Sequence, residues 1–449
     1  MTSVPPPSPA ADPRHRRFSE SLVLEQMVFI AWVSELRAGR RASAITEARR
    51  LLERAVSAGA GFALSERGER LFDPIEVRNC LGWLAQTGRD TEWRDRVAAS
   101  NTAIVKGDPG DDGAPREMVF SHRRRFDLAA FPAGARMRLL LPLPIPCEYH
   151  PTVSVTPIVP DGLNADIVLA YGRLEVRFSL GADRSVTIGA DISLTAVIPA
   201  PRPDAALDDR LREIHLRPSE GLIRVTPRVR DLAARLGGEA PALEAVARFT
   251  RWLAESFAFA FVRYDELGGR APIDWALDEG LFDCQLCASI LVALCRARNI
   301  PARVVTGHFL HRLSPTNHNW VEIWIDGMGW RPFDPLHLAC DSPRPYGADE
   351  WWCDMARRGD YRLAHQRLPL VFTGPMSVRF PARWQMFQTR WGDGAAMDFF
   401  DIDTGALIWR DEVSVRRMEH QARAPLSEGG GDGPVALRRP CPPGGQCRR

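Results

Sequence analysis

The chain has 449 residues, a length that favours two or three domains and allows a sizeable apolar core. Apolar residues make up 45% and charged residues 25%, values close to the soluble globular average, which excludes collagen, a coiled coil and wholesale disorder. Lys plus Arg total 58 against 56 for Asp plus Glu, and the formal net charge of +2 gives no global electrostatic reason to bind nucleic acid or anionic lipid.

Neither a membrane span nor a secretion signal is predicted. The best apolar window, Leu22–Val33, contains Glu25 and Gln26 and predicts an amphipathic helix. The N-terminus lacks the basic segment and apolar run of a secretion signal. We therefore expect a cytoplasmic protein with no membrane partner. Its nine cysteines, an odd number, favour free thiols over a disulfide framework.

The N-terminal half divides into segments of different composition. Residues 1–17 are rich in Pro and Arg and are predicted to be disordered. Apolar residues recur at helical spacing through 18–106, which predicts a helical region. A dense run of turn formers marks 107–117 as a linker. Short apolar stretches then predict a β domain over 118–200, and connecting helices are expected over 201–240.

A buried helix is predicted directly after Asp283. Two neighbouring rows of side chains carry the helical spacing: Leu286, Ile290 and Leu294, and Cys287, Leu291 and Cys295. The helix is expected to end at Asn299-Ile-Pro301, because Asn tolerates the left-handed conformation and Pro forbids continuation. Cys284 falls in the first turn, where free backbone amides and the helix dipole favour a thiolate. Cys284 is therefore placed like a nucleophile.

A strand hairpin is predicted after this helix. Residues 320–325 alternate as a strand, 326–329 form a turn, and 330–334 return antiparallel. His318, at the start of the first strand, therefore lies near Asp334, at the end of the second. A thiol, an imidazole that takes its proton and a carboxylate that orients the imidazole form a Cys-His-Asp set for acyl transfer.

Four ordered blocks of residues resemble the transglutaminase-like superfamily, specifically its bacterial members. The blocks are Cys284 with Ala288, then 296–303, 318–322 and 329–335. The sequence departs from the pattern at Asn299, where glycine is usual, and at Phe282-Asp283 before the cysteine.

The resemblance implies an α+β fold with a papain-like core over 241–340, and Cys284, His318 and Asp334 as its catalytic triad. A preceding β domain is common among such homologues. Residues 341–425 are expected to extend the core, and the Gly- and Pro-rich residues 426–449 to form a disordered tail. No cofactor or metal is expected, and nothing suggests calcium dependence, since no Asp-rich ligand loop of the EF-hand type occurs.

Other interpretations of these residues remain open. Cys284-Gln-Leu-Cys287 also spells a Cys-x-x-Cys pair, a redox centre or half of a zinc site, although Cys287 and Cys295 fit better as core residues. Arg296 and Arg303 suit structural ion pairs or binding of a substrate anion. The tryptophans at 320, 324 and 330 suit packing, and the backbone N–H of Cys284 is the preferred oxyanion donor. His308, His311 and His337 receive no role.

The predicted function is acyl transfer through a thioester on Cys284. His318 deprotonates the thiol, the thiolate attacks a carbonyl, and Asp334 holds the imidazolium. The expected partners are an acyl donor, which is a peptide, a protein or a carrier-bound thioester, and an amine acceptor. If water intercepts the thioester instead, the enzyme is a peptidase or deamidase. A non-catalytic binding module of the same fold is the remaining alternative, and the sequence leaves the oligomeric state open.

Overall fold

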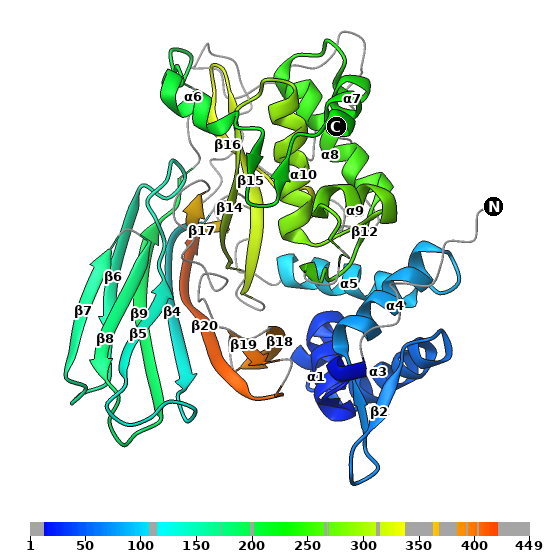
Figure 1. Ribbon diagram of the computed structural model, residues 1–449, viewed down its shortest axis with the longest axis vertical. Helices are drawn as coiled ribbons and strands as arrows, with labels where there is room; N and C mark the ends of the chain where they lie inside the picture. The colour runs from blue at the N-terminus through cyan, green and yellow to red at the C-terminus, as the bar shows by residue number, and fades with distance from the viewer. Residues whose placement is uncertain are drawn as a thin grey trace, which may run out of the picture.

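The computed structural model describes residues 13–106, 115–170, 172–197, 202–264, 267, 269–310, 315–336, 362–367, 384–391, 394–401 and 404–420. Helices and mostly antiparallel sheets are both present, and most strands pair antiparallel without a repeating β-α-β order, which confirms the expected α+β class (Figure 1). Among these residues, no helix is long and apolar enough to cross a membrane. Cys80, Cys147, Cys284, Cys287 and Cys295 are free thiols, as expected.

The N-terminal helical region consists of α1–α5 and a small sheet of order β1-β3-β2. Its helices are α1 (Glu20–Ala31), α2 (Val33–Arg37), α3 (Arg41–Ser57), α4 (Pro74–Gln86) and α5 (Glu92–Lys106), and its strands are β1 (Phe18–Ser19), β2 (Phe62–Leu64) and β3 (Arg70–Phe72). The α4 helix begins where the Asp73 side chain accepts a hydrogen bond from the Ile75 N–H and Pro74 occupies the first turn. These caps explain why the helix starts at this position.

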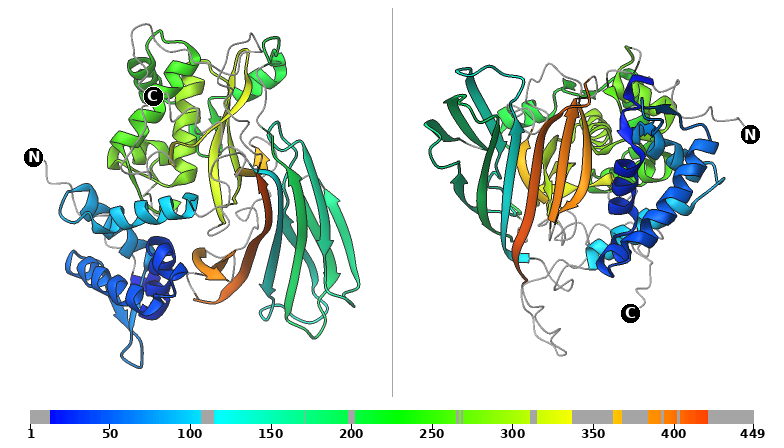
Figure 2. Two further views of the ribbon diagram at one scale, coloured as in Figure 1. Left: turned by 180° about the vertical axis from the view of Figure 1, so that it is seen from behind. Right: turned by 90° about the horizontal axis from the view of Figure 1, so that it is seen from below.

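Helix α1 differs from the amphipathic helix predicted over Leu22–Val33. It is buried on most sides, including Gln26, which is only 3% exposed. Helices α3 and α5 and strand β18 (Trp384–Trp391) all pack against α1 (Figure 2). The sequence window could not reveal this burial, because one of the covering elements lies about 350 residues further along the chain.

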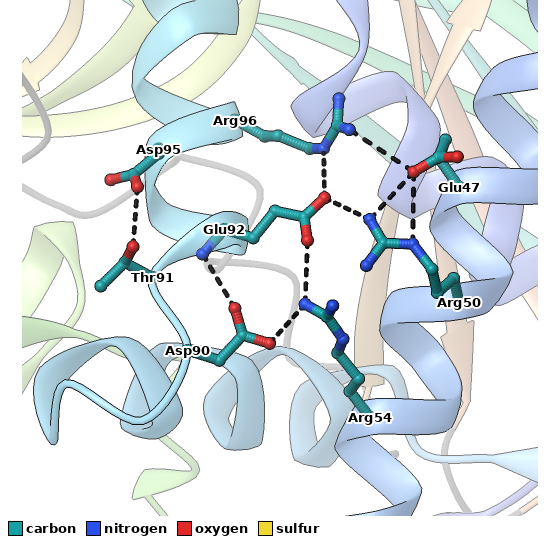
Figure 3. A network of polar contacts seen from close by, with 8 residues as sticks. All are labelled: Glu47, Arg50, Arg54, Asp90, Thr91, Glu92, Asp95 and Arg96. Atoms are coloured by element: carbon teal, nitrogen blue, oxygen red, sulfur yellow. Dashed lines mark hydrogen bonds and ion pairs between the residues drawn. The ribbon is translucent and has the colours of Figure 1, made fainter.

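An ion-pair network joins α3 to α5. Arg54 donates to Glu92 at 2.8 Å and pairs with Asp90 at 2.7 Å, and Arg50 also pairs with Glu92 (Figure 3). Glu92 is half-buried, and the hydrogen bonds from Arg50 and Arg96 outweigh burial, which acts in the opposite direction, and lower the pKa of Glu92 to about 2. The network thus links α3 to the start of α5 and to Asp90 before it.

The predicted disorder over 1–17 is wrong for residues 13–17. Pro13–His15 form a short 3₁₀ helix, His15 is buried, and Arg16 donates to Glu76 at 3.0 Å. The ion pair that orders this segment joins residues 60 positions apart, so no local sequence pattern reveals it. The remainder of that segment, most of the predicted linker and the predicted tail 426–449 lie outside the described residues.

The β domain is a sandwich of two antiparallel sheets. One has the order β18-β19-β20-β4-β9-β6, and the other β5-β8-β7. Its strands are β4 (Pro115–Asp127), β5 (Arg136–Pro142), β6 (Thr152–Ile158), β7 (Ala165–Ala170), β8 (Arg173–Ser179), β9 (Ser185–Thr195), β18, β19 (Gly394–Asp401) and β20 (Leu407–His420). Side chains from both sheets, Phe120 and Ile188 on one and Val176 on the other, meet in the apolar core between them.

The C-terminal segment does not simply extend the core as expected over 341–425. Strand β17 (Arg362–Arg367) joins the core sheet, but β18, β19 and β20 complete the sheet of the β domain through pairing of β20 with β4. In Figure 1 the red strand β20 runs beside β4, and the orange strands β18 and β19 continue the same sheet toward α1. Sequence periodicity does not show which strands pair across 287 residues. The pairing of β20 with β4 places the C-terminal segment in the sandwich.

The core places helices against one sheet of order β16-β15-β14-β17. Its helices are α6 (Asp209–His215), α7 (Pro227–Gly237), α8 (Ala242–Ser256), α9 (Pro272–Glu279) and α10 (Cys284–Ala297), and its strands are β10 (Ser219–Glu220), β11 (Ile223–Arg224), β12 (Ala258–Phe259), β13 (Leu281–Phe282), β14 (Ala302–Phe309), β15 (Thr316–Ile325), β16 (Gly329–Phe333) and β17. Helix α10 is buried along its length between α7, α8 and β15. Helix α7 thus packs into the core, although its segment was expected only to connect domains.

Candidate active site

Cys284 is the first residue of α10 and is half-buried. The Asp283 side chain caps the helix by accepting a hydrogen bond from the Leu286 N–H at 2.8 Å. Tyr264 donates its hydroxyl to the same oxygen of Asp283 at 2.7 Å. Burial raises the pKa of Asp283 to about 6, against the opposing effect of these hydrogen bonds. The capped helix start fixes the backbone that carries the thiol.

His318 and Asp334 meet through the predicted hairpin. Strands β15 and β16 pair antiparallel with Val321 opposite Phe333, so that His318, near the start of β15, and Asp334, directly after β16, lie at the same end of the hairpin. His318 Nε2 lies 2.7 Å from Asp334 Oδ2, and Asp334 is fully buried. The structure therefore brings together the imidazole and carboxylate that the sequence had placed as neighbours.

The thiol of Cys284 completes this arrangement, because it hydrogen-bonds the His318 imidazole. Burial by itself lowers the pKa of His318, but the Asp334 carboxylate and the Cys284 thiol outweigh burial and raise that pKa to about 9. The imidazole is thus charged at neutral pH and can stabilise a thiolate beside it. Thiol, imidazole and carboxylate lie in the order that nucleophilic acyl transfer requires.

Asn319 also contacts the thiol, and sequence reasoning had given it no role. Its side-chain amide donates to Cys284 Sγ at 3.4 Å, and the Thr306 hydroxyl donates to the Asn319 carbonyl oxygen at 2.6 Å. Thr306 and Asn319 are direct partners in the pairing of β14 with β15. The amide is therefore oriented with its N–H groups toward the sulfur. Its position directly after His318 is the one signal that the sequence offered.

Arg362 is a second residue that sequence reasoning missed. It lies in β17, and its Nε donates to Asp334 Oδ2 at 2.9 Å, with both side chains fully buried. The guanidinium carbon also stands 4.9 Å from the centre of the Phe309 ring. Asp334 thus accepts from a cationic side chain in addition to His318. No local motif separates Arg362 from the many other arginines of the chain.

Helix α4 of the N-terminal region holds the segment that precedes Tyr264. The Asn79 side chain donates to the Phe261 carbonyl at 3.0 Å and accepts from the Phe261 N–H at 2.9 Å. The Asp73 carboxylate pairs with Arg263 at 2.6 Å. Phe261 and Arg263, three positions and one position before Tyr264, are therefore held by α4 and its N-cap residue.

The other residues singled out in the sequence make ion pairs or pack in the apolar core. Arg296 and Arg303 make ion pairs, with Glu220 at 2.9 Å and Glu322 at 2.7 Å, as expected for structural partners. Cys287 and Cys295 lie in the apolar core, as expected. The tryptophans at 320, 324 and 330 are buried among other apolar side chains. His308 is buried away from the thiol, whereas His311 and His337 lie outside the described residues.

Residues 230–335 match the family model of the transglutaminase-like superfamily. A protein-glutamine gamma-glutamyltransferase from Pseudomonas aeruginosa is 28% identical over 218 residues, which cover 40% of this chain and 32% of that protein. The match thus spans about a third of the relative's length.

Two solved structures are less similar to this chain in sequence. A candidate cysteine protease from Cytophaga hutchinsonii is 14% identical with a TM-score of 0.41, covering 68% of this chain and 99% of that chain. The periplasmic domain of TgpA from Pseudomonas aeruginosa is 19% identical with a TM-score of 0.28, covering 51% of this chain and 95% of that chain.

Proposed function

Residues 230–335 form a domain of the transglutaminase-like superfamily, and from this we propose that the protein is a cysteine acyltransferase acting through Cys284, His318 and Asp334. One observation supports the proposal above the others. A half-buried thiol at a helix N-terminus touches an imidazole whose other partner is a fully buried carboxylate. A core role for Cys284 would not need these two partners.

The proposed reaction begins with attack of the Cys284 thiolate on the carbonyl carbon of a carboxamide. The negative charge that develops on the carbonyl oxygen is stabilised by the Cys284 backbone N–H at the start of α10. His318, protonated and held by Asp334, then gives its proton to the departing amine or ammonia. The products of this half-reaction are an acyl thioester on Cys284 and a neutral imidazole.

The second half-reaction reverses the proton transfers. The neutral His318 imidazole takes a proton from an incoming amine while the amine nitrogen attacks the thioester carbonyl. Collapse of this intermediate releases the new amide and restores the thiolate. Water in place of the amine gives hydrolysis by the same steps. Because the amine in the first half-reaction can be ammonia, a glutamine side chain is the donor we propose, after the activity named for the curated relative.

The test is a competition between an amine and water for the same acyl group. Glutamine-containing peptides are incubated with the protein and a fluorescent primary amine, and product masses are measured. We expect peptide–amine adducts with wild type, none with Cys284→Ala, and a rate at least about 1,000-fold lower with His318→Ala. Peptide deamidation or cleavage alone would assign the hydrolase alternative. Absence of any product would leave a binding module as the better interpretation.

A matched control is Cys287→Ala. Cys287 lies three residues from Cys284 on the same helix but is fully buried in the apolar core. We expect this variant to keep acyl transfer within a few-fold of wild type. Loss of activity without loss of fold would instead favour a Cys-x-x-Cys redox or zinc site.

A further inference from the structure

The side chain of Arg362 shares one oxygen atom with the proposed catalytic histidine. Asp334 Oδ2 lies 2.7 Å from His318 Nε2 and 2.9 Å from Arg362 Nε. The side chains of Asp334 and Arg362 are both 0% exposed, and that of His318 is 13% exposed. Water therefore screens these charges poorly, and their mutual effects are large.

The ionisable groups around the imidazole come from several elements. Among the described residues, Asp334 follows β16, Cys284 begins α10, and Arg362 comes from β17 behind the carboxylate. Phe309 of β14 and Trp320 of β15 add neutral rings, with centres 5.7 Å and 6.3 Å from the imidazole. The imidazole thus faces one carboxylate, and that carboxylate is itself bound by a permanent cation.

The Arg362 guanidinium weakens the attraction of the Asp334 carboxylate for the His318 proton. A lone buried Asp334 would attract the imidazolium proton strongly and make its release costly. Arg362 compensates part of the carboxylate charge whether or not His318 is protonated. Loss of the His318 proton therefore leaves a balanced Asp334–Arg362 pair and not an isolated buried anion. Proton release from the imidazole becomes easier.

We propose that Arg362 is a positioning residue that holds Asp334 toward His318 and limits how firmly this carboxylate retains the imidazolium proton. The inference rests on the proposed roles of Cys284 and His318. It assigns to β17, which lies beyond the predicted core at 241–340, a direct part in proton transfer. In the acyl-transfer cycle, Arg362 would let His318 protonate a leaving amine and recover the proton at moderate pH.

The test measures the charge on His318 through the alkylation of Cys284. Iodoacetate is an anion and reacts faster beside a cationic imidazole, whereas neutral iodoacetamide senses this charge weakly. The ratio of the two rates, followed over pH and mapped to Cys284 by mass spectrometry, falls as His318 loses its proton. In wild type we expect the midpoint of this fall near pH 9, the pKa of His318.

Three variants separate charge from packing. Arg362→Gln removes the cation, and we expect the midpoint to rise by about one pH unit or more. Arg362→Lys keeps the charge, and we expect a midpoint within about 0.3 unit of wild type. Arg367→Gln is the matched control, because Arg367 lies on the same strand and binds a different buried carboxylate, Glu322, at 2.8 Å. This control should leave the midpoint unchanged.

Each result decides the proposal. An unchanged or lowered midpoint in folded Arg362→Gln would overturn it, as would a rise of equal size in Arg367→Gln. If Arg362→Gln does not fold while Arg362→Lys does, Arg362 has a purely structural role and the proposal also fails. The readout needs only the thiol and the imidazole. A normal alkylation profile without acyl transfer would therefore refute the proposed function and leave this inference standing.

Discussion

At the residue scale, Asn319 contacts the Cys284 sulfur directly and is a fourth candidate site residue, beside the three predicted from sequence. Its amide N–H donates to Cys284 Sγ and stabilises negative charge on the sulfur. A hydrogen bond to a charged group contributes about 1.5–3 kcal/mol, so its loss makes the reactive thiolate less favourable. A thiolate that is less stabilised is intrinsically more nucleophilic, which offsets part of this effect. We therefore expect Asn319→Ala to slow iodoacetamide alkylation of Cys284 at pH 7 by roughly three- to tenfold.

The control for this prediction is Thr306→Val. The Thr306 hydroxyl donates to the Asn319 carbonyl oxygen and so orients the amide that contacts the sulfur, and its removal should slow alkylation less than Asn319→Ala does. Equal rates for wild type and Asn319→Ala would contradict the prediction. Pseudo-first-order labelling at limiting reagent, resolved by intact mass, measures all three proteins.

The candidate site shows what sequence spacing can and cannot supply. Cys284 and His318 were predictable because a helix start and a hairpin are local patterns, and Asp334 followed from antiparallel pairing. Arg362 was not predictable, since its approach to Asp334 depends on β17 pairing with β14 across a long stretch of chain. Asn319 required the relative placement of β15 and α10, which periodicity does not give.

At the element scale, helix α4 stabilises the segment beside the nucleophile. Asn79 makes two hydrogen bonds to the backbone of Phe261, and the Arg78 guanidinium lies 3.7 Å from the centre of the Phe261 ring. We expect Asn79→Ala to lower the free energy of unfolding by about 1–3 kcal/mol, because it leaves a backbone N–H and carbonyl without their partner. We also expect it to slow Cys284 alkylation, through Tyr264 and the Asp283 cap.

Thr87→Ala, at the C-cap of the same helix, is the matched control. The Thr87 hydroxyl donates only within α4, to the Trp83 carbonyl at 2.9 Å and the Leu84 carbonyl at 3.3 Å. Its loss should change stability by less than about 1 kcal/mol and leave alkylation unchanged. Urea unfolding and labelling rates measure both effects. If Asn79→Ala destabilises the protein but labels at the wild-type rate, α4 supports the fold without influencing the site.

The sequence predicts whether a segment is a helix or a strand better than it predicts which other elements that segment pairs with or packs against. The helical region, the β domain and the helix after Asp283 all follow from apolar spacing, and the structure has helices and strands in those places. The domain limits stay a prediction, since elements from distant segments share sheets. Strands β18–β20 illustrate the difficulty, because their alternation fits either the core sheet or the sandwich, and only pairing with β4 decides.

At the scale of the whole molecule, buried histidines join the core sheet to the sandwich. His308 Nδ1 of β14 lies 3.0 Å from His365 Nε2 of β17, and the His308 ring centre lies 5.0 Å from that of His122 in β4. Around them, Arg124 of β4 pairs with Asp411 of β20 at 2.6 Å. Burial, followed by the neighbouring imidazoles, holds the pKa values of His308 and His365 well below 6.5.

This cluster predicts loss of stability in mild acid. Burial also lowers the pKa of His122, although Asp411 opposes this. The unfolded chain binds protons on these histidines below about pH 6.5, whereas the folded chain does not, so stability falls as pH falls through 6.5. For His308 and His365, whose pKa values are lowered most, the slope approaches about 3 kcal/mol per pH unit, and His122 adds to it in the same direction. His318, with its raised pKa, has the opposite sign: its stabilisation is complete below pH 6.5 and is lost toward pH 9.

Urea unfolding at pH 7.5, 6.5, 5.5 and 5.0 tests this prediction. We expect the free energy of unfolding to fall steeply below pH 6.5, and the fall to be shallower in His365→Gln, which removes one of the three groups. His318→Gln should leave the slope below pH 6.5 unchanged, because that histidine is protonated in both states there. Parallel curves for wild type and His365→Gln would show that the cluster is not responsible.

The pairing of β20 with β4 also affects how the chain can be made in a cell. Arg124 leaves the ribosome 287 residues before its partner Asp411, which at about 5–20 residues per second is a delay of roughly 15–60 s. Through this interval one edge of β4 has no strand to pair with, and an open edge is a template for aggregation. Faster translation shortens this exposure, and we expect a chaperone that covers the open edge to protect the chain until β20 emerges.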